Sequence, residues 1–120
     1  MEQPRAHLDV QRNENNVIVV SFLDRKILDE LNITRIEEEL FQLVDGRQNV
    51  RIVLDFANVE HLSSRALGTL ISLLKRVRGV NGELGLCNIA PRIFDVFRIT
   101  RLDKSFRIFA DCQEAVAALG

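Results

Sequence analysis

Residues 50–79 read VRIVLDFANVEHLSSRALGTLISLLKRVRG, and the pattern of apolar residues changes inside this stretch. The segment of residues 50–56 is short, rich in β-branched residues and almost wholly apolar after Arg51, which predicts a strand buried on both faces. From Leu67 to Val77 the apolar residues recur at helical spacing, and Gly79 with the turn after it ends that helix. A buried strand followed by an amphipathic helix predicts a parallel crossover in an α/β sheet.

The flanking sequence extends this pattern on both sides. Two strands at residues 7–12 and 17–23 form a hairpin, and a helix starts near Ile33, with Asn32 or Thr34 as its cap. Downstream we expect a strand at 83–89, a helix from Pro91, a strand at 105–109 and a helix at 112–119 capped by Asp111. Phe94 and Phe97 face the core from the helix that starts at Pro91.

The expected order is β-β-α-β-α-β-α-β-α over a single domain that spans residues 1–120. Strands separated by helices imply right-handed parallel crossovers, and the leading hairpin makes the sheet mixed. The sequence therefore predicts an α/β fold in which helices pack on a mixed, mostly parallel sheet.

Composition excludes several classes of function. A chain of 120 residues fits one domain, and its formal net charge of −1 gives no electrostatic footprint for nucleic acid. No apolar run approaches the ~20 residues that span a bilayer, and the first residues lack the apolar core of a signal peptide. We expect a cytoplasmic protein that binds no nucleic acid directly and does not insert into a membrane.

The two cysteines, Cys87 and Cys112, lie far apart in the sequence and form no CxxC motif. Cys87 sits in an apolar run, which is typical of a small buried hydrophobe. Because a zinc site needs more Cys and His residues at closer spacing, we expect no metal site. A disulfide is the alternative, but nothing marks the chain as secreted.

Ser63 and Ser64 precede the helix of residues 67–77. The first N–H groups of a helix have no partner within it, and a serine hydroxyl commonly accepts a hydrogen bond from one of them. Capping is thus the first interpretation of this pair. With two serines in succession, one can cap the helix while the other faces outward, where an enzyme can reach it.

Motifs for catalysis are absent from the sequence. The serines lack the flanking glycines of G-x-S-x-G, and the histidines are poorly placed as bases, since His61 is too near and His7 lies in the first strand. There is no P-loop and no dinucleotide fingerprint. We therefore expect no catalytic residue, no cofactor and no enzymatic activity.

The segment RIVLDFANVEHLSSRALGTLISLLKRVR, residues 51–78, resembles the core of STAS domains, the family of bacterial anti-sigma factor antagonists. In that family an apolar strand precedes Asp-Ser-Ser/Thr-Gly-Leu-Gly at the start of a helix. Aligned without gaps, Ser63 takes the Asp position and Ser64 takes the position of the phosphorylated serine. The resemblance continues through residues 83–119, and upstream it places Asp24 at the family's acidic position.

The resemblance implies a function. Such domains bind an anti-sigma factor, which is also a serine kinase of the GHKL ATPase type, and they are switched off when it phosphorylates them; a PP2C-type serine phosphatase reverses the mark. Ser64 is then the candidate acceptor and Ser63 the second candidate. The partner-binding face is expected to comprise Asp24 and residues 63–66, namely Ser63, Ser64, Arg65 and Ala66.

Two residues depart from the family pattern. Ser63 replaces Asp, which removes a negative charge beside the acceptor, and Ala66 replaces Gly, which adds a methyl group where helix and partner approach. Arg65 adds a positive charge that either stabilises a phosphoserine or contacts solvent. Ser63 in place of Asp gives more weight to an alternative function: a STAS-domain adaptor or scaffold in a stress-signalling assembly or a transporter complex, without a phosphorylation switch.

Overall fold

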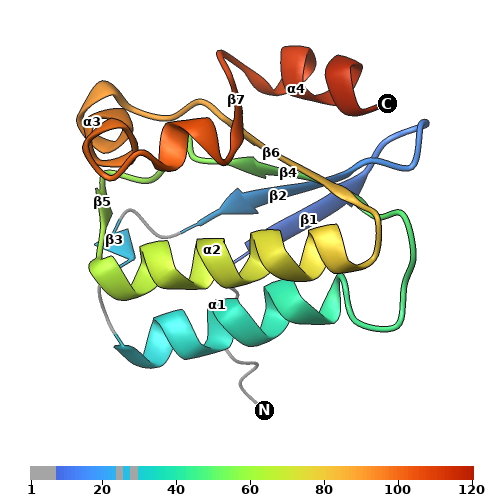
Figure 1. The fold of residues 1–120 in the computed structure, drawn as a ribbon, viewed down its shortest axis with the longest axis horizontal. Coiled ribbons are helices and arrows are strands. Elements are labelled where there is room, and N and C mark those ends of the chain that lie inside the picture. Colours follow the sequence, from blue (N-terminus) through green and yellow to red (C-terminus); the bar gives the residue numbers. More distant parts are fainter. Residues whose placement is uncertain (1–7, 24–25, 28–29) are drawn as a thin grey trace.

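A central sheet of five strands organises the computed structural model, which describes residues 8–23, 26–27 and 30–120 (Figure 1). The strands are β1 (Leu8–Arg12), β2 (Ile18–Phe22), β4 (Arg51–Asp55), β6 (Glu83–Cys87) and β7 (Arg107–Phe109), and they lie side by side in that order. Only β1 and β2 pair antiparallel, whereas every other neighbouring pair is parallel. The mixed, mostly parallel α/β sheet expected from the sequence is confirmed.

The leading hairpin is held by a side chain in its turn. Asn13 Oδ1 accepts hydrogen bonds from the backbone N–H groups of Asn15 and Val17, at 3.0 and 2.8 Å. Asn16 adopts a positive φ of 65°, a conformation that asparagine tolerates better than most residues. These features explain why the sequence ENN at residues 14–16 reverses the chain.

One face of the sheet is covered by α1 (Glu30–Gln42) and α2 (Ser64–Gly79), which lie side by side beneath it in Figure 1. Their apolar faces and the facing side chains of the strands form the main core. Leu40 and Leu73 are fully buried there, as are Ile52 and Leu54 on the central strand. The near-continuous burial of β4 is what a strand covered on both faces requires.

Helix α3 (Pro91–Ile99) adds Ile93 and Phe97 to the same core, and a short 3-10 helix, η1 (Leu102–Lys104), follows it. The expectation that Phe94 faces the core is wrong, because Phe94 is only half-buried. Ile93 takes that place, since residues four apart share one face of a helix and Phe97 fixes which face is buried.

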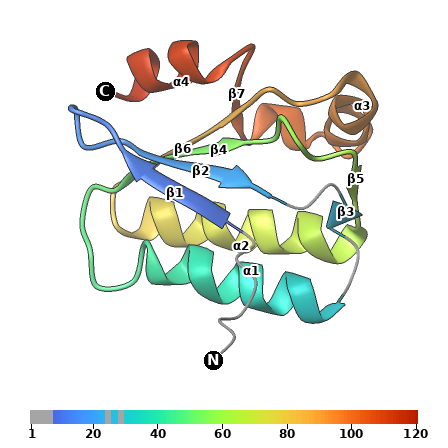
Figure 2. The ribbon, with the colours of Figure 1, turned by 180° about the vertical axis from the view of Figure 1, so that it is seen from behind.

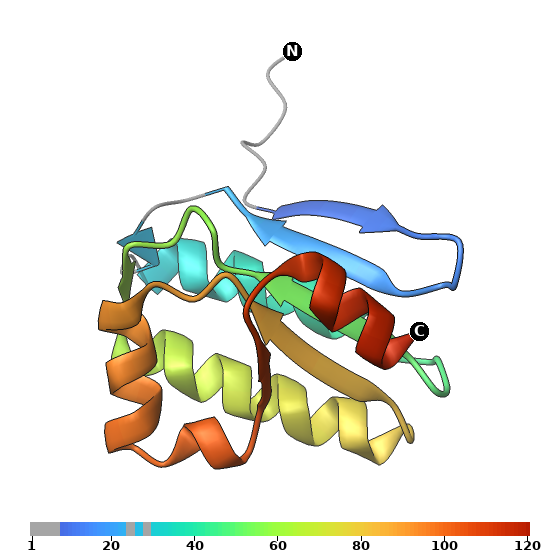
Figure 3. The ribbon, with the colours of Figure 1, turned by 90° about the horizontal axis from the view of Figure 1, so that it is seen from above.

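The opposite face of the sheet is covered by α4 (Cys112–Leu119), which lies over the parallel strands in the view from above (Figure 3). Ala115 and Leu119 of α4 pack on Val17, Val53 and Cys87 to form a second, smaller core. The sheet thus separates a large core from a small one. Strand β1 of the hairpin forms one edge of the main sheet and lies nearest the viewer in the view from behind (Figure 2).

Two features near the start of α1 differ from the sequence-based expectation. The helix begins at Glu30, so Asn32 and Thr34 lie inside it and neither is its cap. A second, two-stranded sheet was not expected: β3 (Lys26–Ile27) pairs parallel with β5 (His61–Leu62). Strands of two residues leave too short a pattern to detect by periodicity.

Burial of Leu73 on α2 provides a test of the main core. Leu73→Ala should lower the free energy of unfolding by about 2–5 kcal/mol, because the side chain is fully buried and a cavity remains. Urea denaturation followed by circular dichroism measures the loss. Ser72→Ala, at an exposed position of the same helix, should change stability by less than about 0.5 kcal/mol. An equal effect of both substitutions would contradict the arrangement of α2.

Candidate functional site

The segment between β4 and α2 is fixed by hydrogen bonds at the carboxyl edge of the sheet. Asp55 Oδ1 accepts from the backbone N–H of Ala57 at 2.9 Å, and the N–H of Val59 donates to the carbonyl of Phe56 at 2.9 Å. The side-chain amide of Asn58 donates to the carbonyl of Phe22 at the end of β2, at 3.4 Å. This ordered loop leads into β5 and from there into the two serines.

Ser63 is the N-cap of α2. Its backbone is extended, with φ −77° and ψ 164°, and its Oγ accepts a hydrogen bond from the N–H of Ala66 at 3.1 Å. Its carbonyl accepts the first helical hydrogen bond, from the N–H of Leu67 at 3.0 Å. The capping interpretation is therefore confirmed for Ser63, whose hydroxyl is half-buried and already engaged.

Ser64 is the first residue of α2 and is exposed. Within the part of the chain that the structure describes, its hydroxyl makes no hydrogen bond. The first turn of α2 contains no acidic residue, so the partial positive charge of the helix N-terminus is not neutralised there. The structure thus separates the two serines: Ser63 holds the helix, and Ser64 presents a free hydroxyl to solvent.

Arg65 is exposed, and its guanidinium Nη2 donates to Thr34 Oγ1 on α1 at 3.1 Å. This contact crosses from α2 to α1 next to the serines. One turn further along α2, Thr69 is buried, and its hydroxyl donates to Glu37 Oε2 at 2.9 Å. Polar contacts therefore tie the N-terminal half of α2 to α1, which limits its movement.

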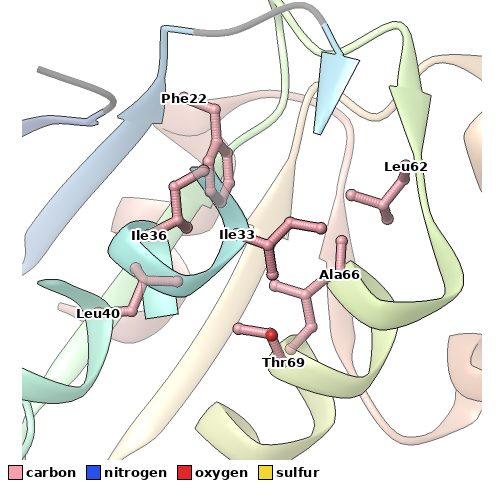
Figure 4. A pocket seen from close by; sticks show the side chains of 8 residues that line it. Phe22, Ile33, Ile36, Leu40, Leu62, Ala66 and Thr69 are labelled. Atoms are coloured by element: carbon pink, nitrogen blue, oxygen red, sulfur yellow. The ribbon is translucent and has the colours of Figure 1, made fainter. Parts of the chain in front are cut away.

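Ala66 points inward rather than toward solvent, with only 4% of its surface exposed. It lines a small apolar cavity between α1, α2 and the ends of β2 and β5, together with Phe22, Ile33 and Leu62 (Figure 4). The cavity, about 10 Å³, is the size of one water molecule at most and is too small for an organic ligand. The methyl group that distinguishes Ala66 from the family's glycine is thus part of the core.

Asp24 and His7 lie outside the described residues. The parallel pairing of β3 with β5 does place residues 26–27 beside His61 and Leu62, the two residues that precede Ser63. Sequence patterns missed this contact because each strand has only two residues. It joins the segment after β2 to the start of α2.

The described residues offer no activated nucleophile at this edge. No histidine among them hydrogen-bonds to Ser63 or Ser64, and His61 is half-buried in β5. Burial raises the pKa of the Cys87 thiol, and contact with Cys112 raises it further. Burial raises the pKa of Cys112 as well. Both thiols are therefore protonated at neutral pH, whereas a nucleophilic cysteine needs the thiolate.

The family model of the STAS domain matches residues 7–115 of this chain. The chain belongs to the STAS domain family. BtrV of Bordetella bronchiseptica, a proposed anti-sigma factor antagonist, is 34% identical over 92 residues, which cover 77% of this chain and 78% of BtrV. The resemblance seen in the sequence around residues 51–78 is therefore confirmed at the level of the family.

Solved structures show the same fold. An anti-sigma factor antagonist (STAS) domain protein of Planctomyces limnophilus superposes with a TM-score of 0.83 at 24% identity, covering 95% of this chain and 98% of that one. SpoIIAA of Bacillus, an anti-sigma factor antagonist, matches in its unphosphorylated form with a TM-score of 0.69 at 15% identity, covering 92% of this chain and 94% of that one. Its phosphorylated form matches with a TM-score of 0.70 at 16% identity, covering 94% and 99%. The STAS fold of this chain therefore accords with its family assignment.

None of the described helices is both long and apolar enough to cross a membrane.

The two serines should respond differently to substitution. Ser63→Ala should lower the free energy of unfolding by about 1 kcal/mol because it removes the cap. Ser63→Asp should preserve the cap, and its negative charge should interact favourably with the helix dipole. Ser64→Ala should change stability by less than about 0.5 kcal/mol, since its hydroxyl is exposed. Chemical denaturation of the three variants measures these differences. Equal losses for Ser63→Ala and Ser64→Ala would show that the capping assignment is wrong.

Proposed function

We propose that this STAS domain is an anti-sigma factor antagonist that binds an anti-sigma factor with GHKL-type serine kinase activity. Phosphorylation of Ser64 by that kinase prevents binding, and a PP2C-type serine phosphatase restores it. The chain itself has no catalytic role. The observation that carries the proposal is the contrast between the engaged hydroxyl of Ser63 and the exposed, unbonded hydroxyl of Ser64.

Accessibility favours Ser64 as the acceptor. A kinase must bring the hydroxyl of its substrate within reach of the γ-phosphate, which requires an exposed side chain. Ser63 is half-buried instead, and its Oγ already accepts a hydrogen bond from the N–H of Ala66, so its hydroxyl is less accessible to a kinase. The names of the relatives, which include anti-sigma factor antagonists, support the same function.

Electrostatics explains how a phosphate can block binding without changing the fold. A phosphoserine carries roughly −1.5 to −2 charges at neutral pH. At a helix N-terminus such a charge is favourable by about 0.3–1 kcal/mol, and no carboxylate in the first turn of α2 opposes it. The free domain should therefore tolerate the modification.

The penalty arises when the partner docks. A phosphate inside an interface must lose its hydration, and a buried charge without a counter-ion costs several kcal/mol. Because each ~1.4 kcal/mol is a factor of ten in affinity, binding should weaken by two to three orders of magnitude. Arg65, the next residue along the chain, carries a positive charge, but its guanidinium already contacts Thr34 on α1.

Substitution of Ser64 tests the switch. Ser64→Asp should weaken binding to the cognate kinase by about 100-fold or more, and Ser64→Ala should change it by about twofold at most. Isothermal calorimetry with the purified partner measures both. Ser72→Asp, which adds the same charge at an exposed position further along α2, is the matched control and should bind normally. Equal weakening by both Asp variants would indicate a general charge effect and not a local switch.

Phosphate mapping tests the acceptor itself. Incubation with the kinase and ATP, followed by mass spectrometry of peptides, should place the phosphate on Ser64 and leave Ser63 unmodified. Ser64→Ala should then accept no phosphate, while Ser63→Ala should still accept it. A protein that gains none on either serine, and that is recovered from extracts with transporter subunits, would instead be an adaptor.

The modified domain should keep its structure. Ser64→Asp and Ser64→Ala should give nearly the same amide spectrum by NMR, with differences confined to the start of α2 and the loop before it. The reason is that the added charge points to solvent at a helix terminus that favours it. Shifts that reach the β1–β2 hairpin would contradict blocking at the interface.

A further inference from the structure

A second group of polar side chains meets at the carboxyl edge of the sheet, on the side covered by α4. Asp55 is the last residue of β4, Cys87 is the last residue of β6, and Cys112 is the first residue of α4. Asp55 and Cys87 lie directly opposite each other in the parallel register. The carboxylate oxygen and the two sulfurs all lie within 4.8 Å of one another.

These three atoms converge on a single polar group. The side-chain amide nitrogen of Asn88 lies 3.0 Å from Asp55 Oδ1, 3.6 Å from Cys112 Sγ and 4.0 Å from Cys87 Sγ. One partially positive NH₂ group is therefore the shared neighbour of three electron-rich atoms. A cation at that point would interact with the same three atoms more strongly.

We propose that Asp55, Cys87 and Cys112 form a binding site for one thiophilic divalent cation, of which Zn²⁺ is the best match. Two sulfurs and one carboxylate oxygen are the ligand types that Zn²⁺ accepts in a tetrahedral site, whereas Mg²⁺ and Ca²⁺ require oxygen. Zn–S distances of about 2.3 Å place two sulfurs about 3.8 Å apart, so each pair of ligand atoms needs to approach by no more than about 1 Å. The fourth ligand of a tetrahedral site would be a water molecule or the side-chain oxygen of Asn88, after rotation of its amide group.

The surroundings of the cluster allow a cation to enter and hold it. Cys87 is fully buried against the small core, whereas Cys112 and Asp55 are half-buried and reach solvent. Open parallel sheets bind ligands at this carboxyl edge. A cation bound there would join β4, β6 and α4, and it would stabilise the folded chain because the unfolded chain does not assemble the three ligands.

Titration of the reduced, metal-free protein with Co²⁺ tests the site. We expect one equivalent to bind, with thiolate-to-cobalt charge-transfer absorption in the near ultraviolet that Zn²⁺ then abolishes by displacement. Zn²⁺ should also release about two protons per ion, since each thiol must ionise to bind. Titration without a charge-transfer band would overturn the proposal.

Variants assign the ligands. Cys112→Ser and Asp55→Asn should each weaken Co²⁺ binding by at least about tenfold, while Asp95→Asn, at an exposed carboxylate of α3, should leave it unchanged. Circular dichroism establishes that each variant is folded. A Cys112→Ser protein that binds Co²⁺ as tightly as the original would rule the site out.

A measurement on the unmodified protein tests the site without relying on variants that could misfold. Zn²⁺ should slow the alkylation of Cys112 in the unmodified protein by at least about tenfold, as measured by mass spectrometry, because a metal-bound thiolate is shielded from the reagent. Mg²⁺ at the same concentration is the control and should give no protection. Equal alkylation rates with Zn²⁺ and Mg²⁺ would overturn the proposal.

Discussion

The hydrogen bond between the N–H of Ala66 and Ser63 Oγ fixes the point at which α2 begins. Everything at the candidate site depends on that starting point, because moving the first helical residue by one position would rotate the following side chains by about 100° around the axis. With Ser63 as the cap, Ser64 faces solvent and Ala66 faces the core. A common way of capping the start of a helix thus leaves one hydroxyl of an adjacent pair exposed.

Packing against the sheet and α1 holds the start of α2 in position. Three helices add their apolar side chains to the large core on one face, and α4 packs on the sheet to form the small core on the other. The start of α2 lies at the carboxyl edge of the sheet and is tied to α1 by the contacts of Arg65 and Thr69. These contacts hold the start of α2 in place. We therefore expect a charge added at Ser64 to change the affinity for a partner and not the fold.

Most of the fold can be predicted from the sequence, because the spacing of apolar residues over a long segment distinguishes a helix from a strand. The buried strand at residues 50–56 and the helix after it were predictable from their change of period, and the observed elements agree. The errors have local causes. Phe94 has the same hydrophobic character as Ile93, so composition alone does not say which of the two faces inward, and the start of α1 carries competing polar residues at positions 32 and 34.

The candidate site was predictable in part. Two serines before a helix indicate a cap, but only the folded structure shows that Ser63 is the cap and that Ser64 is exposed. The inward direction of Ala66 depends on the packing of α1, which no pattern within residues 50–79 contains. The grouping of Asp55, Cys87 and Cys112 likewise depends on strand register and on the packing of α4, because the two cysteines lie 25 positions apart in the chain.

The order of strands in the main sheet, β1-β2-β4-β6-β7, is also their order along the chain. No strand has to insert between two that are already paired, so the sheet can grow outward by adding each new strand to an existing edge. During synthesis, the segments already made can thus assemble while the rest is still being translated. The helix α4 follows β7 in the chain and covers the small core, so it can shield the central strands from water once they have paired.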